Sequence, residues 1–256
     1  MDAAERKRVL VTGATSGIGA ATARRLLTSH FDVAVMGRRV RELEGLEAFG
    51  KSVGGNVLVL PCDLADRAAT DRALKDLRQA WPGLHGIVAN AGVGGPSTLE
   101  ASDTRDFDRI FEINFTSHLR IVRCLIPTLE DGGRIVAVAS VLGRFGIPRY
   151  HAYCASKAAL IGLCRALALE LASRRITVNA VAPGWVRTPM AESGMAEQAR
   201  EAGLTLEDAR KAFLADVPLG RMLEPEEVAM LILMLFGPAA GGITGQALTI
   251  DCGVLA

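Results

Sequence analysis

The sequence predicts an α/β fold in which a parallel sheet is covered by helices on both faces. Short runs of β-branched and aliphatic residues alternate with longer helical patterns along the whole chain. The strand-like runs are apolar throughout instead of alternating with polar residues, which is typical of strands buried on both faces. No repeat, low-complexity stretch or linker interrupts this pattern, so we expect one domain over residues 1–256.

The first half of the chain contains strand–helix pairs. RVLVTG predicts a strand and GIGAATARRLLTSH a helix, and DVAVMG and RRVRELEGLEAF repeat this order. NVLVLPCDL precedes DRAATDRALKDLRQAW, and GIVANAG precedes a long helical stretch. The expected strands are 8–13, 32–37, 56–64 and 86–92, and the expected helices are 17–30, 38–49, 66–81 and about 104–129.

The second half begins with RIVAVAS as a strand, followed by a helix that contains YHAYCASK and by the strand ITVNAVAPG. Two short helical patterns, separated by Gly203, precede the apolar helix EPEEVAMLILMLF and the last strand, ALTID. The expected strands are 134–140, 176–184 and 247–251, and the expected helices are about 150–173, about 190–202, about 205–215 and 224–236.

The composition indicates a cytoplasmic protein with a well-buried core. Of the 256 residues, 50% are hydrophobic and 22% are charged, and the net charge is +1. No basic surplus favours a nucleic acid or a membrane surface as partner. The five cysteines contain no CxxC pair, so we expect neither a disulfide framework nor a metal site. We find no secretory apolar stretch, and the longest apolar run, 228–236, is too short to span a bilayer.

A glycine-rich turn joins the first strand to the first helix. TGATSGIG, residues 12–19, places Gly13, Gly17 and Gly19 between the two elements. Such a turn lets the backbone approach a pyrophosphate, and the helix N-terminus offers free N–H groups and a partial positive charge. We therefore expect a dinucleotide at this turn, and the alternative is a tight turn that binds no ligand.

A dinucleotide-binding fold that prefers NAD usually has an acidic residue at the end of the second strand, where it binds the ribose 2′-hydroxyl. Here Gly37 is followed by Arg38 and Arg39. A guanidinium pairs with a 2′-phosphate, whereas a carboxylate would repel it. The sequence therefore predicts NADP(H) rather than NAD(H), with Arg38 as the main contact, unless both arginines only begin a solvated helix.

The segment YHAYCASK contains both tyrosines of the chain, Tyr150 and Tyr153, together with Lys157. Residues four apart lie on one face of a helix, so the spacing selects Tyr153 as the partner of Lys157 and as the general acid/base. A nearby ammonium favours the phenolate and lowers the pKa of a tyrosine. Ser140 ends an apolar strand at the edge of the sheet where ligands bind, so its hydroxyl can hold a carbonyl oxygen near Tyr153.

Together these motifs resemble the short-chain dehydrogenase/reductase family over nearly the whole chain, in particular 3-oxoacyl-carrier-protein reductases and polyketide ketoreductases. The resemblance implies a Rossmann fold whose parallel sheet has the strand order 3-2-1-4-5-6-7. This chain has Ala89 before Asn90 where the family often has Asn, and Asp251-Cys252-Gly253 where it often has Asp-Gly-Gly. The matching positions are Thr12-Gly13-x-x-x-Gly17-x-Gly19, Asp63, Asn90-Ala91-Gly92, Asn114, Ser140, Tyr153-x-x-x-Lys157 and Pro183-Gly184.

The resemblance also implies roles for individual residues. Ser140, Tyr153 and Lys157 would be catalytic, and Asn114 would belong to a proton relay through water. Family members are usually homotetramers or homodimers. The cofactor would contact Gly13, Thr15, Ser16, Gly17, Ile18, Gly19, Arg38, Arg39, Asp63, Leu64, Asn90, Ala91, Gly92, Tyr153, Lys157, Pro183, Gly184, Val186 and Thr188. The substrate would contact Ser140, Leu142, Arg144, Phe145, Tyr150, Trp185 and Met190.

We therefore expect an NADP(H)-dependent oxidoreductase that reduces a ketone to a secondary alcohol, or catalyses the reverse. Residues 187–222 would form a lid over an apolar pocket, which favours a hydrophobic or acyl-type substrate such as a 3-oxoacyl thioester or a polyketide. Arg144 or Arg149 could bind a polar end. The lid residues concerned are Met190, Met195, Leu204, Leu206, Phe213 and Leu214, which could instead pack against the body or another subunit, and Tyr150 could be only a half-buried aromatic residue.

Other functions compete with this expectation. One is an NAD-dependent dehydrogenase of a small secondary alcohol or hydroxy acid. Another is a sugar-nucleotide epimerase or dehydratase, which would need a long substrate domain after the last strand. A cofactor-sensing binding module would be expected to lack one of the catalytic groups. An acyl carrier protein is a further candidate partner, and the basic residues that could contact it, or could simply be solvated, are Arg120, Arg123, Arg174 and Arg175.

Overall fold

A seven-stranded parallel sheet forms the centre of the computed structural model, which describes residues 6–97 and 104–255. The strand order is β3-β2-β1-β4-β5-β6-β7 and neighbouring strands run parallel, so the expected topology is confirmed. The strands are β1 (Lys7–Thr12), β2 (Phe31–Gly37), β3 (Val57–Pro61), β4 (Leu84–Ala89), β5 (Leu129–Val138), β6 (Thr177–Pro183) and β7 (Ala247–Ile250).

The central strands are buried on both sides of the sheet. In β1, Val9 and Val11 belong to one apolar core and Leu10 belongs to the other, and all three side chains are fully buried. Alternate residues of a strand point to opposite faces. An unbroken apolar run is therefore what a strand between two cores requires.

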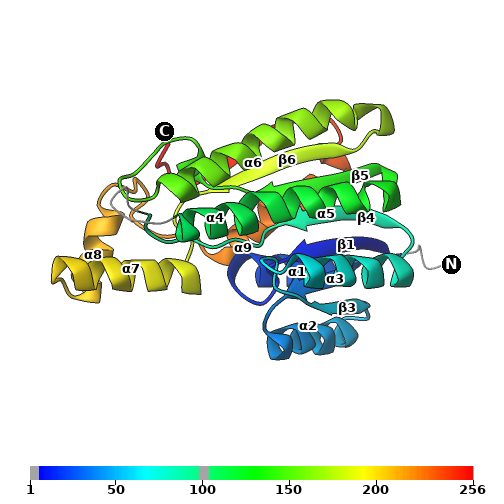
Figure 1. The fold of residues 1–256 in the computed structure, drawn as a ribbon, viewed down its shortest axis with the longest axis horizontal. Coiled ribbons are helices and arrows are strands. Elements are labelled where there is room, and N and C mark those ends of the chain that lie inside the picture. The colour runs from blue at the N-terminus through cyan, green and yellow to red at the C-terminus, as the bar shows by residue number, and fades with distance from the viewer. Residues whose placement is uncertain (1–5, 98–103, 256) are drawn as a thin grey trace.

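Two layers of helices cover the sheet (Figure 1). Leu26 and Leu43 are buried in the core under the first layer, and Leu74 and Leu160 in the core under the second. The first layer contains α1 (Gly17–Thr28), α2 (Val40–Ser52) and α9 (Pro225–Phe236), and the second contains α3 (Arg67–Ala80), α5 (Ser117–Leu125) and α6 (His151–Glu170).

The structure differs from the expected elements most clearly at one helix and one strand, while several other elements begin or end a few residues away from the expected bounds. The helix expected over about 104–129 is divided into α4 (Arg105–Phe111), a π-helical turn (Glu112–Thr116) and α5. The strand expected at 134–140 already begins at Leu129, which pairs with Leu84 before the register shifts. The Glu-Asp-Gly-Gly sequence after Leu129 resembles a turn, which hid this start.

Within the described residues, α6 is the helix that is long and apolar enough to cross a membrane, judged by length and composition alone. Leu160, Cys164 and Leu167 of α6 are buried in the core beside the sheet. This is the ordinary position of an apolar core helix.

The helices α7 (Pro189–Ala202) and α8 (Leu206–Leu214) stand apart from both layers. Figure 1 shows them beyond the carboxyl ends of the strands. They coincide with the two short helical patterns expected between β6 and the last helix. The carboxyl edge of the sheet therefore lies between the main body and these two helices.

Candidate active site

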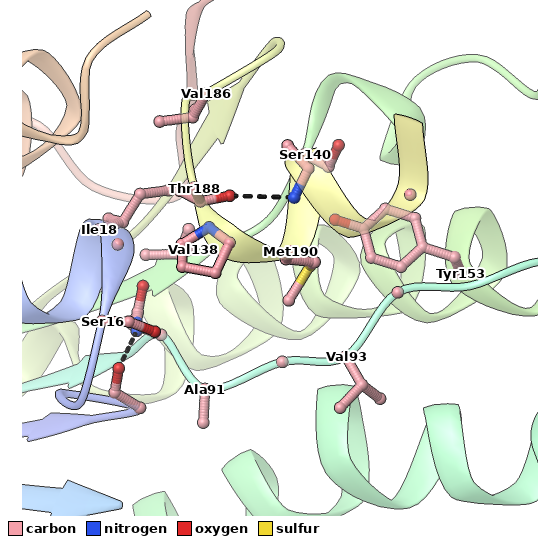
Figure 2. Close-up of a pocket in the computed structure, with 18 of the residues that line it drawn as sticks. Ser16, Ile18, Ala91, Val93, Val138, Ser140, Tyr153, Val186, Thr188 and Met190 are labelled. Carbon is pink, nitrogen blue, oxygen red and sulfur yellow. Dashed lines mark hydrogen bonds between the residues drawn. The ribbon is translucent and has the colours of Figure 1, made fainter. Parts of the chain in front are cut away.

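A cavity of about 580 Å³ opens at the carboxyl ends of the strands (Figure 2). Its walls come from the segments that follow β1 to β6, together with residues of α6 and α7. Ser16 and Ile18 lie on one side of the view, and Ser140 and Tyr153 lie on the other. Residues far apart in the sequence meet here because parallel strands end at the same edge of the sheet.

The wall next to β1 consists of main chain. Gly13 has a φ of +66°, and a Cβ there would lie 2.7 Å from the Cα of Ala91. A Cβ on Gly19 would lie 2.3 Å from the carbonyl oxygen of Gly13. No other residue can occupy these two positions unless the backbone moves, so a ligand here can approach the peptide groups directly.

A polar clamp fixes this glycine turn to the neighbouring strand. The Thr12 hydroxyl accepts hydrogen bonds from the backbone N–H groups of Asn90 and Ala91, both at 3.0 Å. The side-chain amide of Asn90 donates to the carbonyl oxygens of Thr12 at 2.8 Å and Gly13 at 3.3 Å. The cavity is lined by Asn90, Ala91 and Gly92. The side chain of Asn90 also holds the glycine turn in place.

The first turn of α1 is free to receive an anion. Its N-cap residue, Ser16, makes no side-chain capping hydrogen bond, and the first turn contains no acidic residue. The first N–H groups of a helix have no partner within the helix and carry a partial positive charge. Thr15, Ser16, Gly17 and Ile18 all line the cavity at this point. The residues present therefore fit the pyrophosphate of a dinucleotide.

Arg38 and Arg39 line the cavity where β2 ends, as Asp63 and Leu64 do after β3. The Arg39 guanidinium donates to the Thr15 carbonyl oxygen at 2.9 Å and pairs with a carboxylate of its own helix. The Arg38 side chain is 61% exposed, and its distance to the Asp63 carboxylate is 3.8 Å. Arg38 is therefore the arginine of this pair with more freedom to bind a ligand.

Ser140, Tyr153 and Lys157 meet on one wall of the cavity. Ser140 follows β5, and its hydroxyl accepts a hydrogen bond from the Leu142 N–H at 3.1 Å. Figure 2 shows the Tyr153 hydroxyl directed toward Ser140. Tyr153 and Lys157 lie one turn apart on α6, with the Lys157 nitrogen 5.7 Å from the centroid of the Tyr153 ring.

Burial dominates the acid–base properties of this pair. Burial raises the pKa of Tyr153 to about 12, and a hydrogen bond with the Ser140 hydroxyl acts in the opposite direction. Burial also lowers the pKa of Lys157 to about 8, and the ammonium donates to the Val138 carbonyl oxygen at 2.8 Å. The sequence led us to expect a tyrosine pKa lowered by Lys157, but in the structure burial raises it.

Asn114 is fully buried next to the cavity wall. Its side-chain oxygen accepts from the Val93 N–H at 2.8 Å, and its amide donates to the Val93 carbonyl oxygen at 3.0 Å and to the Ser156 hydroxyl at 3.1 Å. A Cβ on Gly92 would lie 3.3 Å from the Asn114 oxygen and 3.4 Å from the Lys157 nitrogen. The two side chains therefore border the same point of the loop after β4.

The segment after β6 continues the cavity wall into α7. Thr188 caps α7 by accepting a hydrogen bond from the Ala191 N–H at 3.3 Å. A Cβ on Gly17 would lie 2.9 Å from the Thr188 methyl group, so the start of α7 lies against the glycine turn. The cavity-lining residues of this segment are Pro183, Gly184, Trp185, Val186 and Thr188.

The rest of the cavity is lined mainly by large side chains. The Tyr150 hydroxyl accepts a hydrogen bond from the Gln198 amide of α7 at 3.3 Å. The rings of Trp185 and Phe213 meet edge to face, with centroids 4.2 Å apart. Leu142, Tyr150, Trp185, Met190, Met195 and Phe213 all line the cavity.

Arg144 and Phe145, expected at the substrate, lie outside the cavity lining. The Arg144 guanidinium donates to the Ala247 carbonyl oxygen, which turns it toward β7. Arg149, the other candidate for a polar end of the substrate, pairs with Glu201 of α7 at 2.7 Å. Both arginines are therefore bound to other residues of the chain. Such long-range contacts cannot be recognised from a sequence pattern.

The expected lid residues divide into three groups. Met190, Met195 and Phe213 face the cavity. Leu204 and Leu206 are 48% and 56% exposed, because they lie around the turn between α7 and α8. Leu214 packs against the core beneath α1, α2 and α9.

Some cavity residues were missed by the sequence analysis. Gly94 and Gly95 line the cavity, as does Gln198. A Cβ on Gly94 would lie 3.4 Å from the Met190 sulfur and 3.8 Å from the Tyr153 ring. The double glycine that follows the Asn-Ala-Gly motif after one residue, Val93, was a signal of close approach that could have been used. Nothing in the sequence singled out Gln198.

Two of the arginines considered for a carrier protein are bound within the chain. Arg120 donates to the Glu112 carboxylate at 2.9 Å. Arg174 donates to the Asp131 carboxylate and to the Ile126 carbonyl oxygen, both at 2.9 Å. These two arginines are therefore less available to a partner than the sequence suggested.

Nearly the whole chain is similar to known reductases. A family profile described as Enoyl-(Acyl carrier protein) reductase matches residues 13–255. A relative from Thermotoga maritima, named 3-oxoacyl-[acyl-carrier-protein] reductase FabG, is 34% identical over 255 residues, which cover 98% of each chain. A Streptomyces coelicolor protein named putative ketoacyl reductase is 37% identical over 260 residues, covering 96% of this chain and 95% of that protein.

Solved structures share the fold. A variant of actinorhodin polyketide ketoreductase with NADPH has a TM-score of 0.91 and 33% identity, covering 99% of each chain. L-sorbose reductase from Gluconobacter frateurii, complexed with NADPH and L-sorbose, also has a TM-score of 0.91, with 26% identity over 98% of this chain and 97% of that one.

Proposed function

The chain belongs to the short-chain dehydrogenase/reductase family, and from this premise we propose that it reduces a ketone to a secondary alcohol with NADP(H), or catalyses the reverse. One observation carries the proposal. The first turn of α1 and the glycine turn before it, which together suit a pyrophosphate, line the same cavity as Ser140, Tyr153 and Lys157. Cofactor and proton donor would thus act on one bound carbonyl.

A bound nicotinamide would supply a hydride to the carbonyl carbon. The residues of the chain would then have to bind and protonate the carbonyl oxygen. Ser140 would donate a hydrogen bond to that oxygen, and Tyr153 would give it the phenolic proton. Because burial raises the pKa of Tyr153 to about 12, the phenol is protonated at neutral pH, the state required for donation. Hydrogen bonds in such a buried site act on developing charge more strongly than they would in water.

Once Tyr153 has given up its proton, the remaining phenolate needs a positive charge and a source of protons. Lys157 is buried one turn away on α6 and supplies the charge. Asn114 borders Lys157 from the other side of Gly92. We infer that Lys157 stabilises the phenolate and that Asn114 helps to return the proton.

We infer NADP(H) as the preferred cofactor. Support comes from Arg38, whose exposed guanidinium lines the cavity directly after Gly37, the position of the acid in an NAD-preferring site. Arg39, bonded to the Thr15 carbonyl oxygen, would hold the glycine turn next to it. Two of the similar solved structures were described with NADPH.

We infer a hydrophobic or acyl-type substrate, such as a 3-oxoacyl thioester or a polyketide. Support comes from Trp185, Met190, Met195 and Phe213 in the cavity wall and from relatives named as 3-oxoacyl and ketoacyl reductases. The likeness to L-sorbose reductase marks the opposite possibility, a small polar keto sugar. Shape alone does not choose between them.

We further propose a cytoplasmic homodimer or homotetramer, for which an acyl carrier protein could deliver the substrate. All five cysteines are free thiols in the structure, which suits a reducing compartment. The carrier would have to use basic groups other than Arg120 and Arg174, since both are bound to carboxylates. Size-exclusion chromatography with light scattering would give the assembly.

The proposed activity can be tested with a panel of carbonyl compounds and NADPH consumption as readout. The panel should contain 3-oxoacyl thioesters, cyclic ketones and keto sugars, each assayed with NADPH and with NADH. We expect turnover of the thioesters or cyclic ketones with NADPH. Binding of NADPH without turnover of any compound would point to a binding module, and a preference for NADH with small hydroxy acids would point to an NAD-dependent dehydrogenase.

A further inference from the structure

The π-helical turn Glu112–Thr116 interrupts the helical segment between α4 and α5. It is closed by a hydrogen bond from the Ser117 N–H to the Glu112 carbonyl oxygen, five residues back. Such turns are rare and less favourable than the α-helix, and they are found frequently at functional sites. This one contains Asn114, and its neighbour Ile113 lines the cavity. Contacts outside the turn must therefore help to keep its conformation.

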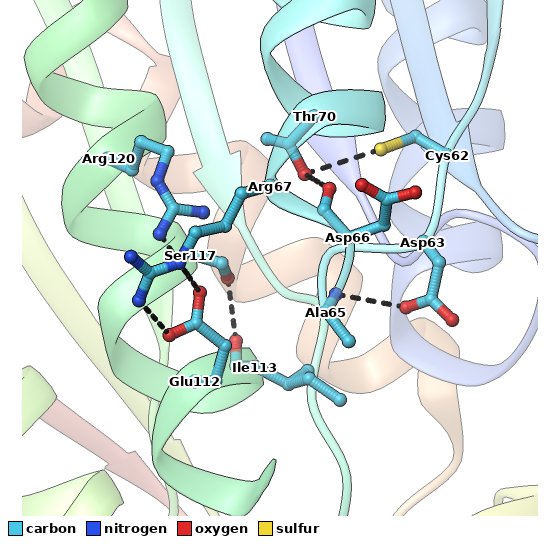
Figure 3. A network of polar contacts seen from close by, with 10 residues as sticks. All are labelled: Cys62, Asp63, Ala65, Asp66, Arg67, Thr70, Glu112, Ile113, Ser117 and Arg120. Carbon is cyan, nitrogen blue, oxygen red and sulfur yellow. Dashed lines mark hydrogen bonds and ion pairs between the residues drawn. The ribbon is translucent and has the colours of Figure 1, made fainter. Parts of the chain in front are cut away.

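Glu112, the first residue of the turn, is held by two guanidinium groups from different helices (Figure 3). Arg67, the first residue of α3, donates to both of its carboxylate oxygens, at 3.3 Å and 3.0 Å. Arg120 of α5 donates to one of them at 2.9 Å. The Glu112 and Arg120 side chains are each 21% exposed, so water competes weakly for the bond between them, whereas the Arg67 side chain is 67% exposed.

The charge of Glu112 is secured by the same contacts. Burial by itself would raise the pKa of this carboxyl group, but the hydrogen bonds and charges of Arg67 and Arg120 hold it below its usual value. One nitrogen of Arg120 is buried and has no hydrogen-bond partner among the described residues. Loss of the Glu112 carboxylate would leave this partly buried guanidinium without its counterion, so the local structure would have to change.

The opposite side of the turn carries the amide of Asn114. Asn114 reaches Val93 on the loop after β4 and Ser156 on α6, with hydrogen bonds of 2.8 to 3.1 Å. A residue in an α-helix is rotated by about 100° from the one before it. If the turn relaxed into a regular α-helix, Asn114 would rotate by a comparable angle and lose these partners.

We propose that Glu112 is a positioning residue: its bridge to Arg67 and Arg120 keeps the turn 112–116 in the π conformation and thereby holds Asn114 beside Lys157. The inference rests on the proposed function, in which Asn114 assists the return of a proton. A purely structural bridge, which only ties α3 to α5, would leave catalysis by the folded enzyme unchanged.

A double-mutant cycle distinguishes the two readings. The variants are Glu112→Ala, Glu112→Gln, Asn114→Ala and the double variant Glu112→Ala/Asn114→Ala. We expect Glu112→Ala to lower kcat by roughly tenfold to a hundredfold, the range associated with small misplacements of a working group. Glu112→Gln, which keeps one hydrogen-bond acceptor, should retain more activity. The double variant should be no slower than Asn114→Ala alone, because Glu112 acts through Asn114.

The control is Asp131→Ala, which breaks the Arg174–Asp131 ion pair of 2.9 Å at the opposite end of the sheet. Its kcat should equal that of the unaltered chain. The Kd for NADPH, from quenching of protein fluorescence, should stay within about threefold in the Glu112 variants, since the glycine turn is untouched. Hydrogen exchange of the amides at 112–117 should speed up in Glu112→Ala and not in Asp131→Ala.

The outcomes separate this inference from the proposed function. If the unaltered chain reduces no carbonyl compound, the proposed function fails, while the hydrogen-exchange comparison still tests the bridge. If Asn114→Ala is slow but folded Glu112→Ala is as fast as the unaltered chain, the inference is overturned. It is overturned equally by additive losses in the double variant, by unchanged exchange at 112–117, or by full activity of Asn114→Ala.

Discussion

The ammonium of Lys157 lies over the ring of Tyr153, 5.7 Å from its centroid, and directs its hydrogen bond to the Val138 carbonyl oxygen. The spacing of four residues in the sequence brings the two side chains to one face of α6. Lys157 is buried and Tyr153 is partly buried, and this burial raises the pKa of Tyr153 and lowers that of Lys157. The acid–base chemistry of the pair therefore depends on burial, and this can be tested.

Removing one hydroxyl group should distinguish the two tyrosines. We expect Tyr153→Phe to lower kcat by roughly 10²- to 10⁴-fold, the usual contribution of a general acid. The Kd for NADPH should change little, because the glycine turn is intact. The measurement is steady-state kinetics combined with fluorescence titration of NADPH.

The matched control is Tyr150→Phe, which removes the hydrogen bond from Gln198 of α7 but no reacting group. It should keep most of kcat and alter KM at most. Loss of activity in Tyr150→Phe, with activity preserved in Tyr153→Phe, would reverse the assignment.

Ketone reduction should slow as the pH rises through about 8. In the proposed reaction, Tyr153 must be protonated and Lys157 must be charged. Burial lowers the pKa of Lys157 to about 8, so the ammonium is present below that pH and is lost above it. Burial raises the pKa of Tyr153 to about 12, so this phenol remains protonated over the same interval.

A profile of kcat against pH from about 6 to about 10 tests this expectation. The lysine is identified by Lys157→Arg, whose side chain keeps its charge over the whole interval. The residual kcat of Lys157→Arg should therefore show no decrease near pH 8. A step of equal size in both proteins would assign the titration to another group.

Arg38 should control the choice between the two dinucleotides. Its side chain is exposed in the cavity, with Asp63 at 3.8 Å, so a 2′-phosphate can replace this weak pairing. We expect Arg38→Ala to lower kcat/KM for NADPH by roughly tenfold to a hundredfold, the value of a hydrogen-bonded charge pair. The value for NADH should change little, because NADH lacks the phosphate.

The comparison variant is Arg25→Ala, which removes a guanidinium from the last turn of α1, away from the cavity lining. Its ratio of kcat/KM for the two cofactors should equal that of the unaltered chain. An unchanged ratio in Arg38→Ala would show that the arginine belongs only to the solvated start of a helix.

Much of the fold and of the chemical centre could be predicted because both depend on short-range patterns. The apolar runs revealed strands buried on both faces, and a parallel sheet brings the groups that follow its strands to one edge. The sequence could therefore predict Ser140, Tyr153 and Lys157 as neighbours at this edge. The backbone at Cys252 has a φ of +57°, a conformation that glycine adopts without strain. This accounts for the glycine that the family often has at this position.

The remaining features depend on long-range contacts. The π turn at Glu112–Thr116 is not encoded by glycine or proline, and its partner Arg67 lies 45 residues away. Arg149 reaches Glu201 across 52 residues, and Arg144 reaches Ala247 across 103. Propensity and periodicity cannot report such pairings. Because of these pairings, neither Arg144 nor Arg149 lines the cavity.

The apolar wall should make activity increase with the size of the substrate. Trp185 and Phe213 meet edge to face in this wall, and Met190 lies beside Tyr153 and Gly94. A buried methylene contributes about 0.8 kcal/mol, which corresponds to about fourfold in kcat/KM. For 3-oxoacyl thioesters of increasing length, kcat/KM should rise by roughly this factor per methylene until the cavity is filled.

Phe213→Ala tests whether this wall is the cause. It removes the ring that contacts Trp185, so the dependence on chain length should become flatter while the shortest substrate is least affected. Leu206→Ala is the matched control, because Leu206 belongs to the same helix but is 56% exposed and does not line the cavity. Its profile should match that of the unaltered chain. If kcat/KM instead fell with size and favoured keto sugars, the methionines and aromatic rings would only pack α7 and α8 together, and the polar groups of Tyr150 and Gln198 would become the better candidates for substrate contacts.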